Sequence, residues 1–314
     1  HTPWVPNQFY IDNVELREDY VPLTYVLSEL DKQIGRLLEG LEDMGVSDNT
    51  IIVFTSDNGP NPSFGQCRTL GMRGWKNSLY EGGIKLPFMV RYPDKIEGGK
   101  IDDSSVICSV DLYHTLCAMA GVEIENGVKF DGEDVSKAIF TGEGVDREKA
   151  IYWDFGRNEY FRHPDIDYHV SPHLAIRKGD WKLLVNSDNT DVELYNLKTD
   201  PYETINLSEK ETERVKNLKT EVLDWYETRP EATWSYGNAD THEPSRRVDG
   251  IEPLFDHWLR DTYAMLGPDD YYYVTGTTAT EGREFPKNIH CWDWNDGIYL
   301  WRSKDLRGVV NSGF

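Results

Sequence analysis

The stretch Thr50-Ile51-Ile52-Val53-Phe54-Thr55, followed at once by Ser56-Asp57-Asn58-Gly59, decides the fold class. Its β-branched and aromatic residues do not alternate with polar ones, so we expect a strand buried on both faces. Apolar residues at spacings of three and four precede it and predict a helix over residues 27–44, with Thr24 as N-cap and Gly45 as its end. A helix followed by a buried strand favours a doubly wound α/β sheet.

The chain beyond this strand continues the α/β pattern. After a stretch rich in glycine and proline, the run over residues 86–92 predicts another strand, and Pro87 places that strand at an edge or start. Apolar residues over 106–120, ended by Gly121, predict a second helix. We therefore assign residues 1–125 to an α/β domain.

The pattern changes after residue 125. Residues 174–185 predict a β-hairpin, residues 193–196 a short strand, and residues 215–225 a closing helix. These elements indicate a small α+β subdomain over residues 126–229.

The tail, residues 230–314, shows a third sequence pattern. Residues 230–250 are polar, contain prolines and glycines, and are typical of a linker. Residues 251–314 are rich in aromatic side chains, and strands are expected at 271–277 and 298–303. This all-β pattern is about the length of one propeller blade with its lead-in.

Composition narrows the function classes. The 314 residues contain 33 Lys and Arg against 55 Asp and Glu, giving a net charge of −22. We expect no nucleic-acid partner and no membrane partner, because this charge repels anionic polymers and no long apolar run exists. The four cysteines, Cys67, Cys108, Cys117 and Cys291, are too sparse for a disulfide scaffold.

Asp57 and Asn58 are the first candidate site. They follow a predicted strand, where ligands of open α/β sheets bind, and they offer hard oxygen ligands for Ca²⁺ or Mg²⁺. The alternative is an Asx turn that ends a strand and holds no metal.

Lys76 is the second candidate, since it follows Gly71-Met72-Arg73-Gly74-Trp75 and could approach an oxyanion closely. The alternative is a glycine-rich surface loop with a solvated lysine. His1, beside Thr2 and Pro3, could donate a proton to a leaving group, or could lie in an ordinary terminal loop.

A cluster of basic residues between the two patterns is the last candidate. His163, His169 and His173, with Arg162 and Arg177, could bind an anionic substrate together with Arg73. Their spacing is not that of a metal site, and scattered loop histidines are the alternative.

Several motifs occur in a characteristic order over residues 1–230. They are His1-Thr2-Pro3, the strand with Ser56-Asp57-Asn58-Gly59, Lys76 followed by Tyr80-Glu81-Gly82-Gly83, Leu86 to Pro93, Asp111 to Leu116, Ala175 to Leu184, and Glu193 to Glu203. In this order they resemble the C-terminal part of a type I sulfatase of the alkaline-phosphatase superfamily.

The resemblance implies specific roles. Asp57 and Asn58 would bind calcium, with magnesium possible, Lys76 would hold the sulfate oxygens, and His1 would lie at the sulfate and the leaving-group oxygen. The expected substrate is a sulfated polysaccharide or oligosaccharide. The expected location is periplasmic or secreted.

The chain also departs from that family. Its members mature a Cys or Ser in a Cys/Ser-x-Pro-x-Arg element to formylglycine, and neither that element nor the paired N-terminal aspartates is present. We expect a missing N-terminal half of the domain to carry them. We also expect the isolated chain to be inactive.

The tail carries a second resemblance, to the first blade of five-bladed β-propeller glycosidases. It rests on residues 258–263, 267–277 and 295–306, and it implies that Asp261 is a general base. Thr262 stands where that family usually has proline, and a β-rich accessory module is the alternative. The two resemblances together predict a sulfatase–glycosidase fusion for polysaccharide degradation, with the remaining blades elsewhere.

Three other functions stay open. A phosphodiesterase or phosphonate hydrolase of the same superfamily would use the same metal and lysine. A glycosidase with a remnant sulfatase part would rely on the propeller. A glycan-binding protein would stack sugars on the aromatic tail.

Overall fold

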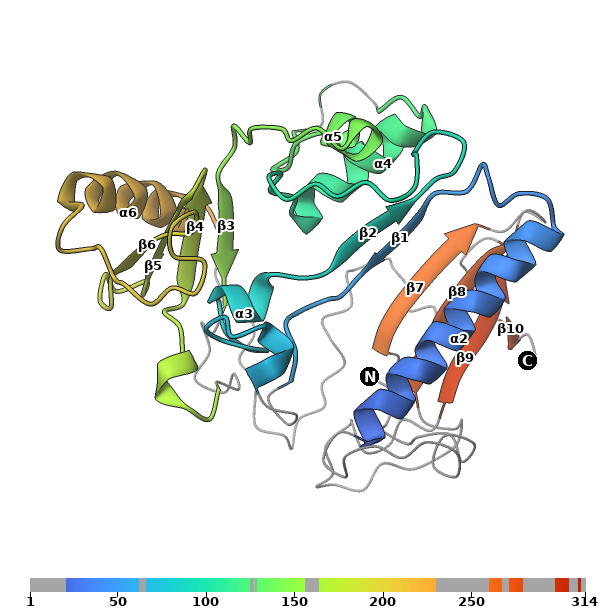
Figure 1. Ribbon diagram of the computed structural model, residues 1–314, viewed down its shortest axis with the longest axis horizontal. Helices are drawn as coiled ribbons and strands as arrows, with labels where there is room; N and C mark the ends of the chain where they lie inside the picture. Colours follow the sequence, from blue (N-terminus) through green and yellow to red (C-terminus); the bar gives the residue numbers. More distant parts are fainter. Residues whose placement is uncertain are drawn as a thin grey trace, which may run out of the picture. The chain divides into compact units, whose positions relative to one another are not determined.

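The computed structural model describes residues 21–61, 66–124, 127, 129–155, 164–229, 260–266, 271–278, 297–304 and 310–311 (Figure 1). The chain divides into two compact units, His1–Ala232 and Thr233–Phe314. The predicted linker over 230–250 lies outside the described residues. None of the helices in the described part combines the length and apolar character needed to span a bilayer.

The first described element is helix α2 (Val21–Asp43). The predicted N-cap at Thr24 is wrong, because Thr24 lies inside the helix. The predicted end is confirmed: Gly45 has φ +69°, and the N–H of Val46 donates to the carbonyl of Leu41 over 3.1 Å.

Strand β1 (Ile52–Thr55) follows α2 and pairs antiparallel with β2 (Phe88–Arg91), with Ile52 opposite Arg91 (Figure 1). Both strands are where the sequence predicts them. The expectation that β1 is buried on both faces is wrong, because β2 is its one partner in the described part of the chain and its apolar residues are only half-buried. An apolar run predicts a strand, but burial on both faces also requires covering layers.

A helical segment follows β2. It consists of η3 (Ser109–Asp111), α4 (Leu112–Ala120) and α5 (Ser136–Thr141). The helical segment therefore begins with η3 at Ser109, three residues after the predicted start at residue 106. Helix α4 ends as predicted at Gly121, which has φ +73°.

Asp111 organises this segment. Its fully buried carboxylate accepts hydrogen bonds from the backbone N–H groups of Cys108 (2.7 Å) and Glu133 (2.8 Å). The guanidinium of Arg147 pairs with both carboxylate oxygens, at 2.6 and 3.0 Å. The motif that begins at Asp111 thus has a structural role.

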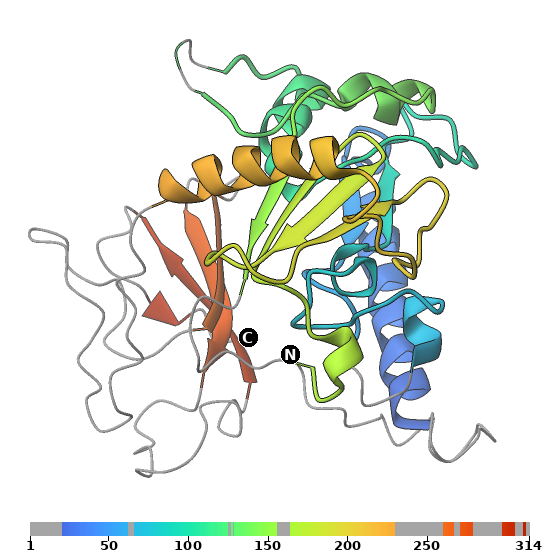
Figure 2. The ribbon, with the colours of Figure 1, turned by 90° about the vertical axis from the view of Figure 1, so that its left-hand side faces the viewer.

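A four-stranded antiparallel sheet forms the C-terminal part of the first unit. It contains β3 (Ile151–Asp154), β4 (Leu174–Lys178), β5 (Trp181–Val185) and β6 (Glu193–Asn196), in that order. The predicted hairpin is confirmed as β4–β5, while β3 is an element that the sequence analysis missed. Helix α6 (Thr212–Glu227) lies across one face of the sheet, as Figure 2 shows.

Alternate residues of this sheet face two different layers. On one face Leu174, Ile176, Leu183, Val185 and Leu194 form a core with Leu218 and Val222 of α6. On the other face Ala175, Leu184 and Tyr195 pack against Leu79 and Tyr80, which precede the short helix α3 (Glu81–Ile84). The sheet therefore carries the region around residue 80 on its second face.

The second unit contains a four-stranded antiparallel sheet in the order β10-β9-β8-β7. Its strands are β7 (Arg260–Leu266), β8 (Tyr272–Thr278), β9 (Gly297–Ser303) and β10 (Val310–Asn311). The strands expected at 271–277 and 298–303 are confirmed as β8 and β9. Such a meander is the form of one propeller blade, and its assignment to a propeller stays a prediction.

Candidate functional site

Asp57 and Asn58 form a tight turn at the carboxyl end of β1. The N–H of Asn58 donates to Asp57 Oδ1 over 3.0 Å, and the side-chain amide of Asn58 donates to the carbonyl of Gly59 over 2.8 Å. Asp57 is exposed, and its second carboxylate oxygen accepts no hydrogen bond from the described residues. Because Asp57 accepts the N–H of the next residue, while the N–H of Gly59 donates to Gly83, this is not an Asx turn, and it presents oxygen atoms for a cation.

Two backbone hydrogen bonds tie this turn to the loop that carries Lys76. The N–H of Gly59 donates to the carbonyl of Gly83 over 2.7 Å, and the N–H of Lys76 donates to the carbonyl of Pro60 over 3.0 Å. A Cβ on Gly59 would lie 2.1 Å from the carbonyl oxygen of Gly82. Only glycine permits this close approach, which brings the two predicted motifs together.

The Lys76 loop, residues 71–80, is folded back on itself. Gly74 has φ +84°, and the N–H of Gly82 donates to the carbonyl of Arg73 over 2.7 Å. A Cβ on Gly82 would lie 2.2 Å from the carbonyl oxygen of Gly74. Most residues from Gly74 onward are buried and Lys76 is half-buried, so the alternative of a solvated surface loop is wrong.

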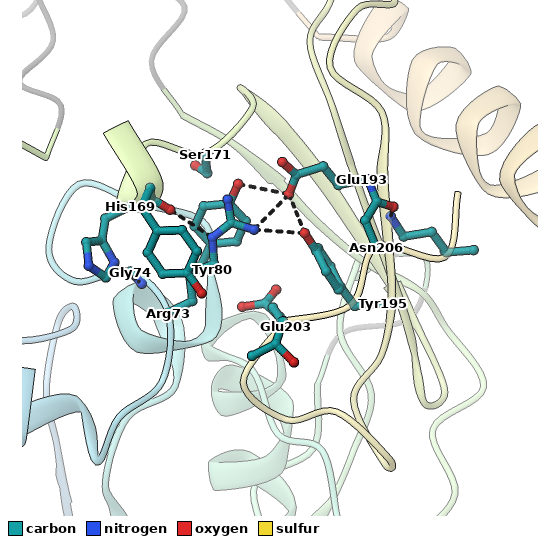
Figure 3. A network of polar contacts seen from close by, with 12 residues as sticks. Arg73, Gly74, Tyr80, His169, Ser171, Glu193, Tyr195, Glu203 and Asn206 are labelled. Carbon is teal, nitrogen blue, oxygen red and sulfur yellow. Dashed lines mark hydrogen bonds and ion pairs between the residues drawn. The ribbon is translucent and has the colours of Figure 1, made fainter. Parts of the chain in front are cut away.

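Arg73 anchors the loop to β6 (Figure 3). Its guanidinium donates to the hydroxyl of Tyr195 over 2.8 Å, pairs with Glu193 at 3.3 Å, and lies 3.7 Å from the ring centroid of Tyr80. Both tyrosine hydroxyls donate to Glu193, and burial together with the charge of Glu193 raises the pKa of Tyr80 and of Tyr195. The sequence analysis assigned Arg73 to substrate binding and did not predict these contacts within the chain.

His169 also holds the loop. Its Nδ1 accepts the N–H of Gly74 over 2.8 Å, and its ring lies 4.0 Å from that of Trp75. Because Nδ1 is the acceptor, the neutral ring carries its proton on Nε2. Burial lowers the pKa of His169, and the charge of Arg73 lowers it further. His169 is thus buried beside the loop backbone, so the alternative of a scattered loop histidine is wrong for this residue.

This histidine makes stability depend on pH. Because its folded-state pKa lies below the ordinary value of about 6.5, the unfolded chain gains the proton first as pH falls. The stabilisation is complete above about pH 6.5 and is lost progressively below it. We expect thermal unfolding of wild type to show this loss. The variant His169→Asn, which keeps an acceptor near Nδ1, should show a flatter profile; equal slopes would contradict the assignment.

A cavity of about 1340 Å³ lies beside the strand-end turn in the first unit. Its lining includes Asp57, Asn58, Asn77, Glu81 and Arg177. The guanidinium of Arg177 lies 3.9 Å from Glu81 Oε2. The predicted metal ligands and one predicted substrate-binding cation therefore line the same cavity.

The remaining predicted residues are not brought together. His1, Arg162 and His163 lie outside the described residues. His173 is half-buried and lines a separate hollow of about 480 Å³. Asp261 lies in β7 of the second unit, where the register with β8 shifts between Arg260 and Tyr263.

The sequence analysis missed a buried charged trio. Lys182 has no exposed surface, and its Nζ lies 2.9 Å from Glu81 Oε1 and 2.9 Å from Glu203 Oε1. The one signal for it was a lysine between Trp181 and Leu183 in a strand with apolar residues on both faces.

Two family models match the chain. The one described as N-sulphoglucosamine sulphohydrolase, C-terminal, matches residues 71–227, and the one described as Sulfatase matches residues 1–122. The chain belongs to the sulfatase family. The ordered motifs over residues 1–230, and with them the resemblance to a type I sulfatase of the alkaline-phosphatase superfamily, are confirmed.

Two curated sulfatases from Bacteroides thetaiotaomicron are similar to this chain. An N-acetylglucosamine-6-O-sulfatase is 35% identical over 184 residues, covering 57% of this chain and 30% of that protein. An N-acetylgalactosamine-6-O-sulfatase is 28% identical over 229 residues, covering 65% of this chain and 41% of that protein. The chain thus spans less than half the length of these relatives.

Solved structures support the α/β fold of the sulfatases. Ps i-CgsB is 26% identical with a TM-score of 0.63, covering 76% of this chain and 51% of that one. The structure of BT4656 in complex with its substrate D-glucosamine-2-N,6-O-disulfate is 27% identical with a TM-score of 0.52, covering 72% and 46%.

Proposed function

We propose that this chain supplies the cation-binding and sulfate-binding part of a sulfuric ester hydrolase that acts on sulfated carbohydrates. The observation that carries the proposal is the pair of backbone hydrogen bonds that joins the Asp57-Asn58 turn to the Lys76 loop. Cleavage of a sulfate ester develops charge on the sulfate oxygens and on the leaving alcohol. Positive groups held together in advance stabilise that charge.

Asp57 and Asn58 fit calcium in the kind of atom they offer, and magnesium is an alternative. Calcium takes six to eight oxygen ligands, whereas within the described residues no group of three or more His, Cys, Asp or Glu could hold a metal. We propose that paired aspartates in a segment outside this chain complete the site. A cation bound there would offset the charge of the sulfate oxygens.

Lys76 and His1 would bind the sulfate group and protonate the leaving alcohol, respectively. The ammonium group of Lys76 would bind sulfate oxygens as a point charge. The imidazole of His1 would donate a proton to the oxygen of the leaving alcohol. The nucleophile would be the hydrate of a formylglycine in a segment outside this chain.

The relatives suggest which substrate to test first. Two of them are named for 6-O-sulfated amino sugars, and BT4656 was solved with a disulfated glucosamine. Since the chain has a net charge of −22, local cations such as Lys76 and Arg177 must attract an anionic glycan. We propose a polysaccharide or oligosaccharide that carries such sulfated sugars.

The second unit extends the proposal. Its four-stranded sheet supports a propeller module. In this proposal Asp261 is the general base of that module, which is fused to the sulfatase part so that one protein removes sulfate and cleaves glycosidic bonds. Such a protein would be periplasmic or secreted. The relatives, which are more than twice as long as the matched part of this chain, support a longer protein.

The test is sulfate release by the product of the complete reading frame. We expect release from 6-sulfated N-acetylglucosamine or N-acetylgalactosamine, loss of activity in a calcium chelator, and recovery with calcium; the isolated 314 residues should release none. Turnover of phosphodiesters or phosphonates alone, glycoside cleavage alone, or glycan binding without turnover would each overturn the proposal.

A further inference from the structure

A fully buried lysine joins the C-terminal sheet to the region that follows the Lys76 loop. Lys182 lies on β5 on the same face as Leu184, which packs against Leu79 and Tyr80. Its Nζ contacts carboxylate oxygens of Glu81 and Glu203, each at 2.9 Å. The contact therefore connects parts of the chain that are about a hundred residues apart.

Glu203 strengthens this connection from a second direction. Its other oxygen, Oε2, accepts the backbone N–H of Glu81 over 2.6 Å. Glu81 is thus held through its side chain by Lys182 and through its backbone by Glu203. Because Glu81 begins α3 directly after the Lys76 loop, these bonds fix the point from which the loop leaves.

The charges of Lys182, Glu81 and Glu203 indicate that the trio fixes the position of the chain more than it adds stability. Burial acts to raise the pKa of Glu81, but the charge and hydrogen bond of Lys182, with Arg177, bring that pKa below its ordinary value. The same carboxylates raise the pKa of Lys182 against the effect of burial. Buried ion pairs contribute little net stability compared with apolar residues of the same volume. Their value here lies in the position they impose.

Glu81 also reaches the cavity. Its Oε2 lies 3.9 Å from the guanidinium of Arg177, which lines the cavity with Asp57 and Asn58. While Lys182 binds Glu81 Oε1, the charge of Glu81 is shared between two cations. Arg177 then keeps positive charge available to an anionic group in the cavity.

We propose that Lys182 is a positioning residue for sulfate ester hydrolysis, because it fixes Glu81 and thereby the Lys76 loop beside the Asp57-Asn58 turn. The inference rests on the proposed function. It gives the C-terminal sheet, which holds none of the proposed reacting groups, a direct part in the geometry of the site.

The test compares Lys182→Met with the matched control Lys178→Met. Lys178 lies in the same hairpin and pairs with Glu221 at 2.9 Å, but this exposed pair does not contact the Lys76 loop. Hydrogen exchange in the 314-residue chain would report the amides of Gly59, Lys76 and Gly82. In the complete protein, kinetics of sulfate release would separate kcat from KM.

For Lys182→Met we expect exchange at these three amides to rise at least about tenfold and kcat to fall about 100-fold, with a smaller change in KM. Lys178→Met should leave all of these values at wild-type levels. Unchanged exchange in Lys182→Met would overturn the proposal.

A further variant separates positioning from folding. Lys182→Met with Glu203→Gln removes one buried charge of each sign, so it should recover thermal stability that Lys182→Met loses. Exchange should stay fast and kcat low; recovery of both would show a purely structural lysine and overturn the proposal. If the wild-type protein releases no sulfate, the proposed function fails, while the exchange results still decide whether Lys182 holds the loop.

Discussion

Replacing Lys76 with alanine in the complete protein is expected to lower kcat/KM for sulfate release by about 10²–10³-fold, or about 3–4 kcal/mol of transition-state stabilisation. The loop around Lys76 is largely buried and tied to the strand-end turn, so the backbone that carries the lysine is held in place before the reaction. A preorganised charge acts mainly on the transition state, and most of the loss should therefore be in kcat. Steady-state measurement of released sulfate tests this.

The control is Lys210→Ala, which removes an exposed lysine in the turn before α6. Its kinetic constants should match those of wild type, and thermal unfolding should show that both variants fold. A Lys76→Ala variant with the wild-type rate would exclude Lys76 from sulfate binding.

Replacing Asp111 with alanine is expected to lower the free energy of unfolding by about 3–5 kcal/mol. The change leaves the Arg147 guanidinium, whose side chain is only 5% exposed, without its buried partner. It also removes the acceptor for two backbone N–H groups. Urea unfolding followed by circular dichroism gives the size of the loss.

Asp102→Ala is the matched comparison. Asp102 also accepts backbone N–H groups, those of Ser104 and Ser105, but it is exposed and pairs with no arginine in the described part of the chain. Its loss should cost only about 1 kcal/mol. If the two variants were equally stable, the buried pair with Arg147 would contribute nothing.

Elements with local signals could be predicted from the sequence. The β4–β5 hairpin has a turn at Gly179, where φ is +59°, and α6 has apolar residues at helical spacing. β3 was missed because four residues without a turn signal give no clear period. β1 was found, but its burial was not, because burial depends on neighbours that the local sequence does not specify.

In the candidate site, too, residues marked by the local sequence could be predicted and residues that depend on distant partners could not. Asp57, Asn58 and Lys76 could be found because a strand end and a group of glycines mark them locally. The roles of His169 and Lys182 could not, since each depends on a partner far along the chain. A lysine in a strand indicates a solvent-facing position, and only the second layer over β5 reverses that expectation.

The second face of the C-terminal sheet has a consequence for how such genes can recombine. Leu79 and Tyr80 share one apolar core with Ala175, Leu184 and Tyr195, so the boundary predicted near residue 125 does not separate two interchangeable modules. A chimaera joined there from two diverged sulfatases would combine mismatched halves of that core. Viable crossovers should therefore concentrate outside the span from about residue 73 to residue 203, which a chimaera should take whole from one parent.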